Sequence, residues 1–285
     1  MPDGAVPHER GSVAYRDFGG NGQTVMLLHG LGGNLAHWGA LAPLLQDRYR
    51  LLAIDLPSHG ASTAPTTYSF DADVSAVDEV RRHLGLDRPA LVGHSYGGML
   101  AVALAAGRPG AYRVVVNIDG IGFALGSEAE PEVQNEQLPV WSGVTAGDAN
   151  WLEAEIEREV REAADVGLRL DPDGEMVRRA FQLGSDGLWH SSPTTDRFVE
   201  IIRALEALRL MPFYAATSCR TVTVVAEHPH AANDEAAAGL RQHAGRVQAA
   251  LRAAGYELDS VASGHYAHVE VPDVVADRFE RWIGG

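Results

Sequence analysis

Four short apolar runs, separated by segments with helical spacing, constrain the fold of this chain more than any other feature. The runs are TVMLLHG (24–30), YRLLAIDLP (49–57), PALVGHS (89–95) and RVVVNIDG (113–120). Each is nearly continuous in apolar residues, which is typical of parallel strands that helices cover on both faces. The segments 34–46, 70–84 and 95–107 between them have helical spacing and helix-compatible ends. This alternation predicts an α/β fold with a mostly parallel sheet and right-handed crossovers.

The alternation stops after Asp119 and resumes at 220. Segments near 149–165, 173–183 and 194–208 have helical spacing, but no convincing strand is evident between 123 and 216. The rest of the chain predicts a strand at 220–227, a helix near 233–254, a strand near 256–262 and a helix at 272–283. We therefore expect one α/β core domain, residues 1–122 and 217–285, with a helical cap inserted at residues 123–216.

Composition excludes several classes of function. The formal net charge of −15 argues against nucleic acid and anionic membranes as partners. All 23 basic residues are arginine, and without lysine neither Schiff-base chemistry nor a Walker-type phosphate loop can form. The single cysteine, Cys219, excludes an intrachain disulfide and a multi-cysteine metal site. Because no signal peptide or membrane span is visible, we expect a cytoplasmic protein, with a homodimer left open.

One serine stands between glycines where a strand should end and a helix should begin. In LVGHSYGG, residues Gly93, Ser95 and Gly97 form the G-x-S-x-G pattern of a nucleophile elbow. The turn is so sharp that the residues two positions to either side must lack a bulky side chain. The helix that follows points its positive end at the serine, which favours a developing anion. We therefore predict that Ser95 is a catalytic nucleophile.

A glycine-rich segment after the first run supports this interpretation. In HGLGGN (29–34) the glycines allow the backbone to curl so that an amide N–H faces the serine. The backbone N–H groups of Leu31 and Tyr96 are therefore predicted to hold the oxyanion of an acyl-transfer intermediate.

Taken together, these motifs resemble the α/β-hydrolase superfamily over nearly the full length of the chain. The matching segments are LLHGLGGN, IDLPSHGAS (54–62), GHSYGG and SGHYAHVEVP (263–272), in the order and at the spacing of the family. The resemblance implies a serine hydrolase that needs no cofactor and in which Asp55 organises a turn. Haloalkane dehalogenases and epoxide hydrolases of this superfamily carry Asp at the elbow, so their chemistry is disfavoured here.

The resemblance also implies that His265 is the general base, because the family's catalytic histidine lies between the last strand and the closing helix. His268, three residues later, is the rival candidate. For His268 we expect loop packing or a surface position instead.

The usual position of the acid is occupied by proline. Relatives usually carry Asp after the strand before the last, where this chain has AEHPH with Pro229. Asp119 is the best replacement, because some members of the superfamily supply the acid from this strand end. Glu227, Asp234 and Glu235 stay open as alternatives, and so does a Ser–His dyad.

The same loop could suggest a metal site through Glu227, His228 and His230. No further clustered ligand supports it, so we expect no metal.

Aromatic residues should help to form an apolar substrate pocket under the cap. Trp38, Phe123 and Trp141 are the candidates for its wall, although core packing is the simpler role for Trp38. The insertion carries four more aromatic residues, and of its six aromatic residues some should line the pocket and most should pack the cap onto the core. The four are Trp151, Trp189, Phe198 and Phe213.

The sequence thus predicts hydrolysis of a carboxylic ester, thioester or related acyl compound through an acyl-enzyme. The expected partner is a small molecule with an apolar portion. Two alternatives stay open. One is acyl transfer, perhydrolysis, a lyase step or C–C cleavage at the same site, and the other is a ligand receptor with little turnover.

Overall fold

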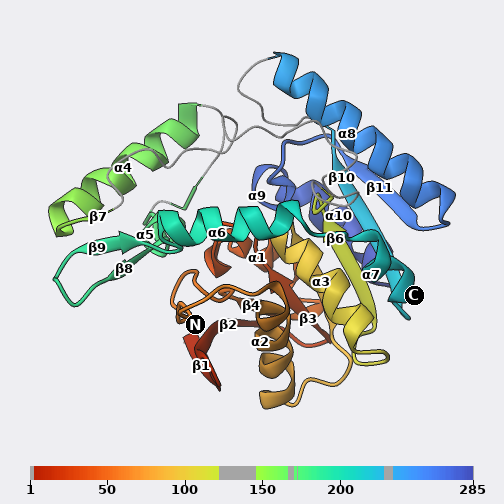
Figure 1. The fold of residues 1–285 in the computed structure, drawn as a ribbon, viewed down its shortest axis with the longest axis horizontal. Coiled ribbons are helices and arrows are strands. Elements are labelled where there is room, and N and C mark those ends of the chain that lie inside the picture. The colour runs from red at the N-terminus through yellow and green to blue at the C-terminus, as the bar shows by residue number, and fades with distance from the viewer. Residues whose placement is uncertain (1–2, 122–145, 166–169, 172, 228–233, 285) are drawn as a thin grey trace.

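The computed structural model describes residues 3–121, 146–165, 170–171, 173–227 and 234–284. Its centre is an eight-stranded sheet with the order β1-β2-β4-β3-β5-β6-β10-β11 (Figure 1). The strands are β1 (Asp3–His8), β2 (Gly11–Gly19), β3 (Gln23–Leu28), β4 (Tyr49–Ile54), β5 (Ala90–His94), β6 (Val114–Ile118), β10 (Arg220–Ala226) and β11 (Glu257–Val261).

From β4 to β11 all neighbouring strands are parallel, whereas β1 and β2 join the edge in antiparallel pairing. Every residue of β5 and β6 is buried, as expected of strands that helices cover on both faces. The six strands expected from the sequence are all present, so the α/β interpretation is confirmed.

Helices cover both faces of the sheet because successive strand residues point to opposite sides. On one face Met26 and Leu28 pack with α2 (Phe70–His83), α3 (Tyr96–Gly107) and α8 (Asp234–Ala253). On the other face Val25 and Leu27 pack with η1 (Leu35–Trp38), α1 (Ala42–Leu45) and α10 (Pro272–Ile283). Two further short helices are α7 (Met211–Ala216), at the end of the segment expected to be inserted, and α9 (Ala267–Glu270). Tyr214 of α7 packs in the same apolar cluster as α3.

The described part of the insertion mixes helices with a small sheet. The helices are α4 (Ala149–Asp165), α5 (Glu175–Arg178) and α6 (Thr195–Glu206). Three short strands pair antiparallel in the order β7-β9-β8, namely β7 (Ala146–Gly147), β8 (Phe181–Leu183) and β9 (Trp189–Ser191). A separate apolar cluster holds α4, α5 and β8 together through Leu152, Ile156, Val177, Ala180 and Phe181.

Several sequence-based expectations about local structure are wrong, for physical reasons. The insertion contains strands, and the helix expected at 173–183 ends after one turn at Arg178 because the chain then pairs with β9. The helix expected at 34–46 is divided in two, with Gly39 capping the first part. Strands β1 and β2 were not expected, because β1 buries only Val6 and so has no apolar run.

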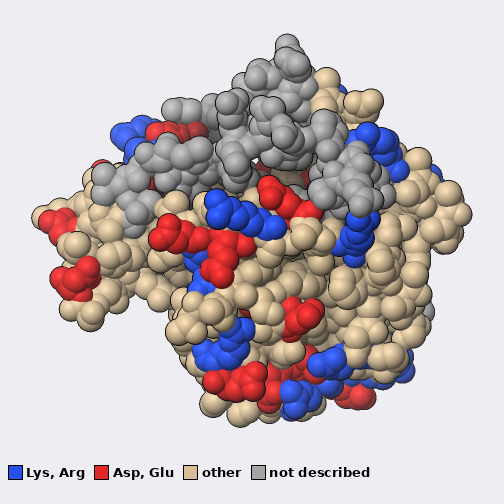
Figure 2. Space-filling view, viewed as in Figure 1, with Lys and Arg blue, Asp and Glu red and all other residues tan. Residues whose placement is uncertain are grey.

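Acidic and basic side chains are interspersed over the face shown in Figure 2. None of the helices in the described ranges is long and apolar enough to cross a membrane.

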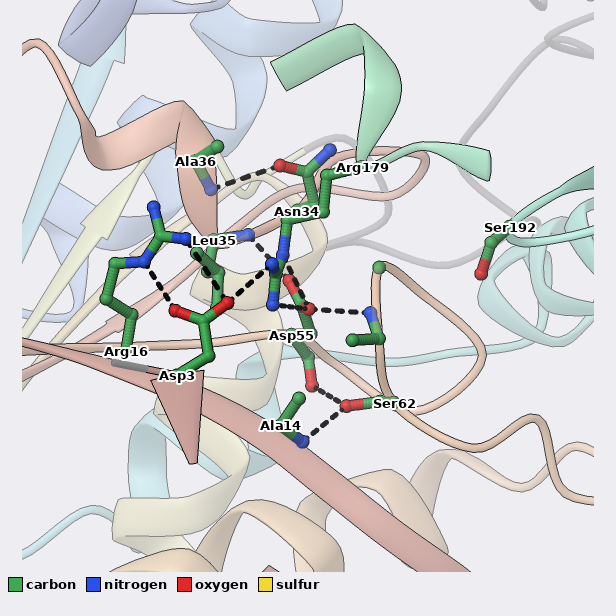
Figure 3. A network of polar contacts seen from close by, with 12 residues as sticks. Asp3, Ala14, Arg16, Asn34, Leu35, Ala36, Asp55, Ser62, Arg179 and Ser192 are labelled. Atoms are coloured by element: carbon green, nitrogen blue, oxygen red, sulfur yellow. Dashed lines mark hydrogen bonds and ion pairs between the residues drawn. The ribbon is translucent and has the colours of Figure 1, made fainter. Parts of the chain in front are cut away.

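Asp55 fastens the turn after β4. Its side chain is fully buried, and its carboxylate accepts hydrogen bonds from the backbone N–H of Leu35 at 2.8 Å and of Ala61 at 2.7 Å. Arg179, from the insertion, donates to the same carboxylate through Nε at 2.9 Å (Figure 3). Burial raises the pKa of Asp55, and the Arg179 guanidinium opposes that rise. Asp55 therefore organises this turn, as the resemblance implies. Its carboxylate also binds Arg179 of the insertion.

Further ion pairs extend this contact to the N-terminal strands. Arg179 Nη1 lies 2.7 Å from Asp3, and Arg16 lies 2.6 Å from both Asp3 and Glu175. Figure 3 shows Arg16 and Arg179 meeting at Asp3, with Arg179 also reaching Asp55. These paired charges hold α5 and its C-terminal end to the core, while Ile201 and Leu205 of α6 pack in the main apolar cluster.

The substitution Arg179→Met should lower the free energy of unfolding by about 3 kcal/mol, because it leaves the buried Asp55 carboxylate without its cation. Urea denaturation at neutral pH measures the difference. Arg178→Met is the matched control, since Arg178 pairs with Glu153 at 2.8 Å on the surface. The control should unfold like the wild type. Equal midpoints for all three proteins would contradict the prediction.

Candidate active site

Ser95 lies at a strained corner of the backbone between β5 and α3. Its φ of 50° and ψ of −117° lie in a region that non-glycine residues rarely occupy. A Cβ at Gly93 would lie 2.1 Å from the carbonyl oxygen of Gly97, and one at Gly97 would lie 2.4 Å from that of Leu28. Both glycines are thus required by the close approach of the backbone, and the corner has the geometry of a nucleophile elbow.

The backbone on both sides of this corner is anchored. The N–H of Ser95 donates to the carbonyl of Ile118 at 2.8 Å, and the carbonyl of Ser95 accepts from the N–H of Met99 at 3.1 Å. The Ser95 side chain is half-buried and has no hydrogen-bond partner among the residues that the structure describes.

His265 and Asp119 meet at the carboxyl edge of the sheet. Asp119 follows β6 and His265 follows β11, and Nδ1 of His265 lies 2.6 Å from Oδ2 of Asp119. The other oxygen, Oδ1, accepts from the backbone N–H of Ala226 at 3.1 Å. Asp119 has a φ of 52°, which few non-glycine residues adopt. A carboxylate in this position favours the tautomer with a proton on Nδ1 and leaves Nε2 of His265 free to exchange one.

Of the other candidate acids, only Glu227 has a described side chain, and it does not contact His265. The carboxylate of Glu227 accepts a hydrogen bond from the Ser260 hydroxyl at 2.6 Å instead of contacting His265. Pro229, His228 and His230 lie outside the described residues, as do the side chains of Asp234 and Glu235. Within the described ranges, no group of three or more His, Cys, Asp or Glu residues is arranged to hold a metal ion.

His268 packs inside the loop that carries His265. It is fully buried, and its ring centroid lies 4.3 Å from that of Trp38 and 4.6 Å from that of His94. Neither ring nitrogen has a partner among the described residues. Burial lowers the pKa of His268 well below its usual value, so the ring is neutral. Of the two histidines that competed for the role of base, the structure brings only His265 to Asp119.

The loop after β3 curls back on itself beside the elbow. Gly32 has a φ of 75°, its N–H donates to Nε2 of His59 at 3.1 Å, and the N–H of Gly33 donates to the carbonyl of Gly30 at 3.0 Å. No hydrogen bond within the described part of the chain uses the backbone N–H of Leu31 or Tyr96. Tyr96 is the first residue of α3, where backbone N–H groups have no intrahelical acceptor.

Two buried histidines support this loop and were not singled out from the sequence. His59 accepts from Gly32, and Nε2 of His29 accepts from the backbone N–H of Leu56 at 3.0 Å. Both belong to the motifs HGLGGN and IDLPSHGAS, so their positions were visible. Their roles were not, because the two segments meet only in the folded protein.

Of the three residues expected in the pocket wall, only Trp38 lies in the described part of the chain. Trp38 is fully buried in the core, so it lies inside the protein instead of on an open wall. Phe123 and Trp141 lie outside the described residues. Phe198 of α6 packs against the loop after β3, where a Cβ at Gly32 would lie 3.4 Å from its ring.

The side chain of Tyr96 contacts a group of aromatic residues made up of Tyr68, Phe70 and Phe213. The Tyr96 hydroxyl donates to the buried carboxylate of Asp73 at 2.8 Å and lies 3.1 Å from the hydroxyl of Tyr68. Burial raises the pKa of Asp73 to about 7. The ring of Phe70 packs on both Tyr96 and Phe213, with centroids 6.2 Å apart in each pair.

Comparison with known proteins agrees with the fold. Residues 23–153 match the family model of the α/β-hydrolase fold. A fluoroacetate dehalogenase from Burkholderia sp is 39% identical over 97 residues, which cover 32% of this chain and 32% of that protein. The chain spans about a third of the length of the curated relatives that it matches.

Solved structures resemble the chain over its whole length. An E-2-(acetamidomethylene)succinate hydrolase has a TM-score of 0.68 and 20% identity, with 100% of this chain and 99% of the other covered. The enol-lactonase from Burkholderia xenovorans LB400 has a TM-score of 0.64 and 19% identity, with coverage of 99% and 100%. The matched segment and the shared architecture show that this chain has the α/β-hydrolase fold.

Proposed function

We propose that the chain is a serine hydrolase that cleaves a carboxylic ester, thioester or related acyl compound through an acyl-enzyme. The observation that carries the proposal is the contact of 2.6 Å between His265 Nδ1 and Asp119. The backbone of His265 contacts His94, the residue before the serine at the strained strand-to-helix corner. A serine hydroxyl is a weak nucleophile and needs an oriented base. An imidazole whose Nδ1 is held by a carboxylate is such a base.

In this mechanism Oγ of Ser95 attacks the acyl carbon while Nε2 of His265 takes the hydroxyl proton. Asp119 stabilises the imidazolium that forms. The backbone N–H groups of Leu31 and Tyr96 donate to the oxyanion of the tetrahedral intermediate. The proton on Nε2 then passes to the leaving group, and a water activated by His265 hydrolyses the acyl-enzyme by the same steps in reverse order.

The insertion, residues 123–216, is proposed to act as a cap over this site. Phe198 of α6 supports this role, because its ring packs on Gly32, the residue after the proposed oxyanion donor Leu31. An aromatic wall beside the reacting carbonyl suits a substrate with an apolar portion.

Hydrolytic dehalogenation, suggested by the name of one relative, fits the site less well. Displacement of a halide by a carboxylate gives an ester that water can cleave, whereas displacement by the Ser95 hydroxyl would give a stable ether. The enol-lactonase is a better guide to the reaction type, because a lactone is a cyclic ester and suits attack by serine.

A fluorophosphonate probe should label the wild-type protein at one residue, because the phosphorus centre is attacked by an activated serine hydroxyl. Peptide mass spectrometry should locate the adduct on Ser95, and Ser95→Ala should lose it. Stable labelling at another residue, or none in the folded wild type, would refute the proposed nucleophile.

The substitution Asp119→Asn should lower kcat for p-nitrophenyl esters roughly 10³- to 10⁴-fold, because the amide favours the wrong tautomer of His265. Glu227→Gln is the matched control and should stay within about threefold of the wild type, since Glu227 contacts Ser260 and not His265. A large loss in the Glu227 variant with little effect of Asp119→Asn would reverse the assignment.

A further inference from the structure

His94 lies where the proposed nucleophile, the proposed base and the loop after β3 meet. It is the last residue of β5, directly precedes Ser95 and is fully buried. Its Nε2 donates to the main-chain carbonyl of His265 at 2.8 Å. The ring centroids of His94 and His265 lie 4.5 Å apart. One side chain thus contacts the base while its own backbone continues into the nucleophile.

His265 has few other restraints. Among the described residues its hydrogen bonds are the one from its side chain to Asp119 and the one that its carbonyl accepts from His94. The first fixes the orientation of the imidazole, and the second fixes the position of the backbone that carries it. The Glu270 carboxylate holds the neighbouring backbone by accepting from the N–H groups of Gly264 at 2.6 Å and Tyr266 at 3.1 Å. The bond from His94 adds a direct link between the backbone of His265 and the residue before Ser95.

The opposite side of the His94 ring packs against the loop after β3. A Cβ at Gly30 would lie 2.8 Å from Nδ1 of His94 and 3.2 Å from the Cβ of Ser95. A side chain at position 30 would therefore displace the ring. The glycine lets the loop that carries Leu31 approach His94 closely.

Two more rings from the His265 loop lie beside the ring of His94. The centroids of Tyr266 and His268 lie 5.0 Å and 4.6 Å from that of His94. A neutral ring fits these contacts, since burial lowers the pKa of His94 well below its usual value. A neutral His94 that donates through Nε2 has no proton on Nδ1, which has no partner among the described residues.

We propose that His94 is a positioning residue that sets the distance from His265 to Ser95 by donating a hydrogen bond to the His265 carbonyl. The proposal rests on the proposed serine hydrolase function. His94 does not touch substrate and acts only through His265. Its loss therefore slows the chemical step and leaves the binding of substrate unchanged.

The test is a double-mutant cycle that measures the labelling of Ser95 by a fluorophosphonate, with KI and kinact determined separately. His94→Asn should lower kinact roughly 10²-fold, the effect of a misplacement of about 1 Å, and leave KI unchanged. His94→Gln should recover most of the rate, because its amide N–H can reach the carbonyl that the shorter Asn cannot. In the His265→Ala background, His94→Asn should cause no further loss, since both changes act through one group.

A matched control separates positioning from packing. His268→Leu removes another buried ring of the same cluster, which has no hydrogen bond to the described residues, and should change kinact less than threefold. Thermal unfolding of each variant checks that the protein folds.

Two results would overturn the proposal: equal rates for the Gln and Asn variants, or an undiminished effect of His94→Asn when His265 is absent. If His265→Ala alone labels as fast as the wild type, the proposed function fails instead. If only the Asn variant fails to fold, His94→Leu replaces it in the cycle, because it keeps a buried side chain and removes the donor to the His265 carbonyl. That variant should lower kinact at least tenfold in the wild type and leave it unchanged in the His265→Ala background.

Discussion

The structure of this site depends on the close approach of backbone at the Ser95 corner. Gly97 packs on the carbonyl of Leu28 and Gly93 on that of Gly97, with no room for a side chain at either position. This contact brings the end of β3, the end of β5 and the start of α3 together at one point. The strain in Ser95 persists because the surrounding sheet and helix over-determine its conformation. Because α3 begins directly after Ser95, the backbone N–H of Tyr96 has no acceptor within the helix.

Asp119, the proposed acid, directly follows β6, and neighbouring residues stabilise the turn that contains it. Asn117 is fully buried; it accepts from the N–H of Gly120 at 2.9 Å and donates to the Gly120 carbonyl at 3.0 Å. It also donates to the hydroxyl of Tyr214 at 2.9 Å. These bonds close the turn that contains Asp119, while the Ala226 N–H orients one carboxylate oxygen. These bonds hold the turn that places the Asp119 carboxylate at the imidazole of His265.

The insertion reaches the same region through polar contacts. Asn34, in the loop after β3, donates to the carbonyl of Met176 at 2.8 Å, and Asp55 binds Arg179 while accepting from the N–H of Leu35. These contacts link α5 and its C-terminal end to the loop that carries Leu31. A movement of the insertion would therefore shift the loop that carries Leu31, one of the proposed oxyanion donors.

The sequence by itself determined the parallel sheet, the elbow at Ser95 and the loop after β3, because continuous apolar strands and obligatory glycines are local signals. It also favoured Asp119 and His265, although only the fold brings residues 146 positions apart to 2.6 Å. Tertiary structure alone decided the edge strands β1 and β2 and the small sheet of the insertion, whose pairing partners are distant or weakly apolar. The contact between His94 and His265 was likewise decided only by the tertiary structure. A hydrogen bond between segments 171 residues apart leaves no pattern in either segment.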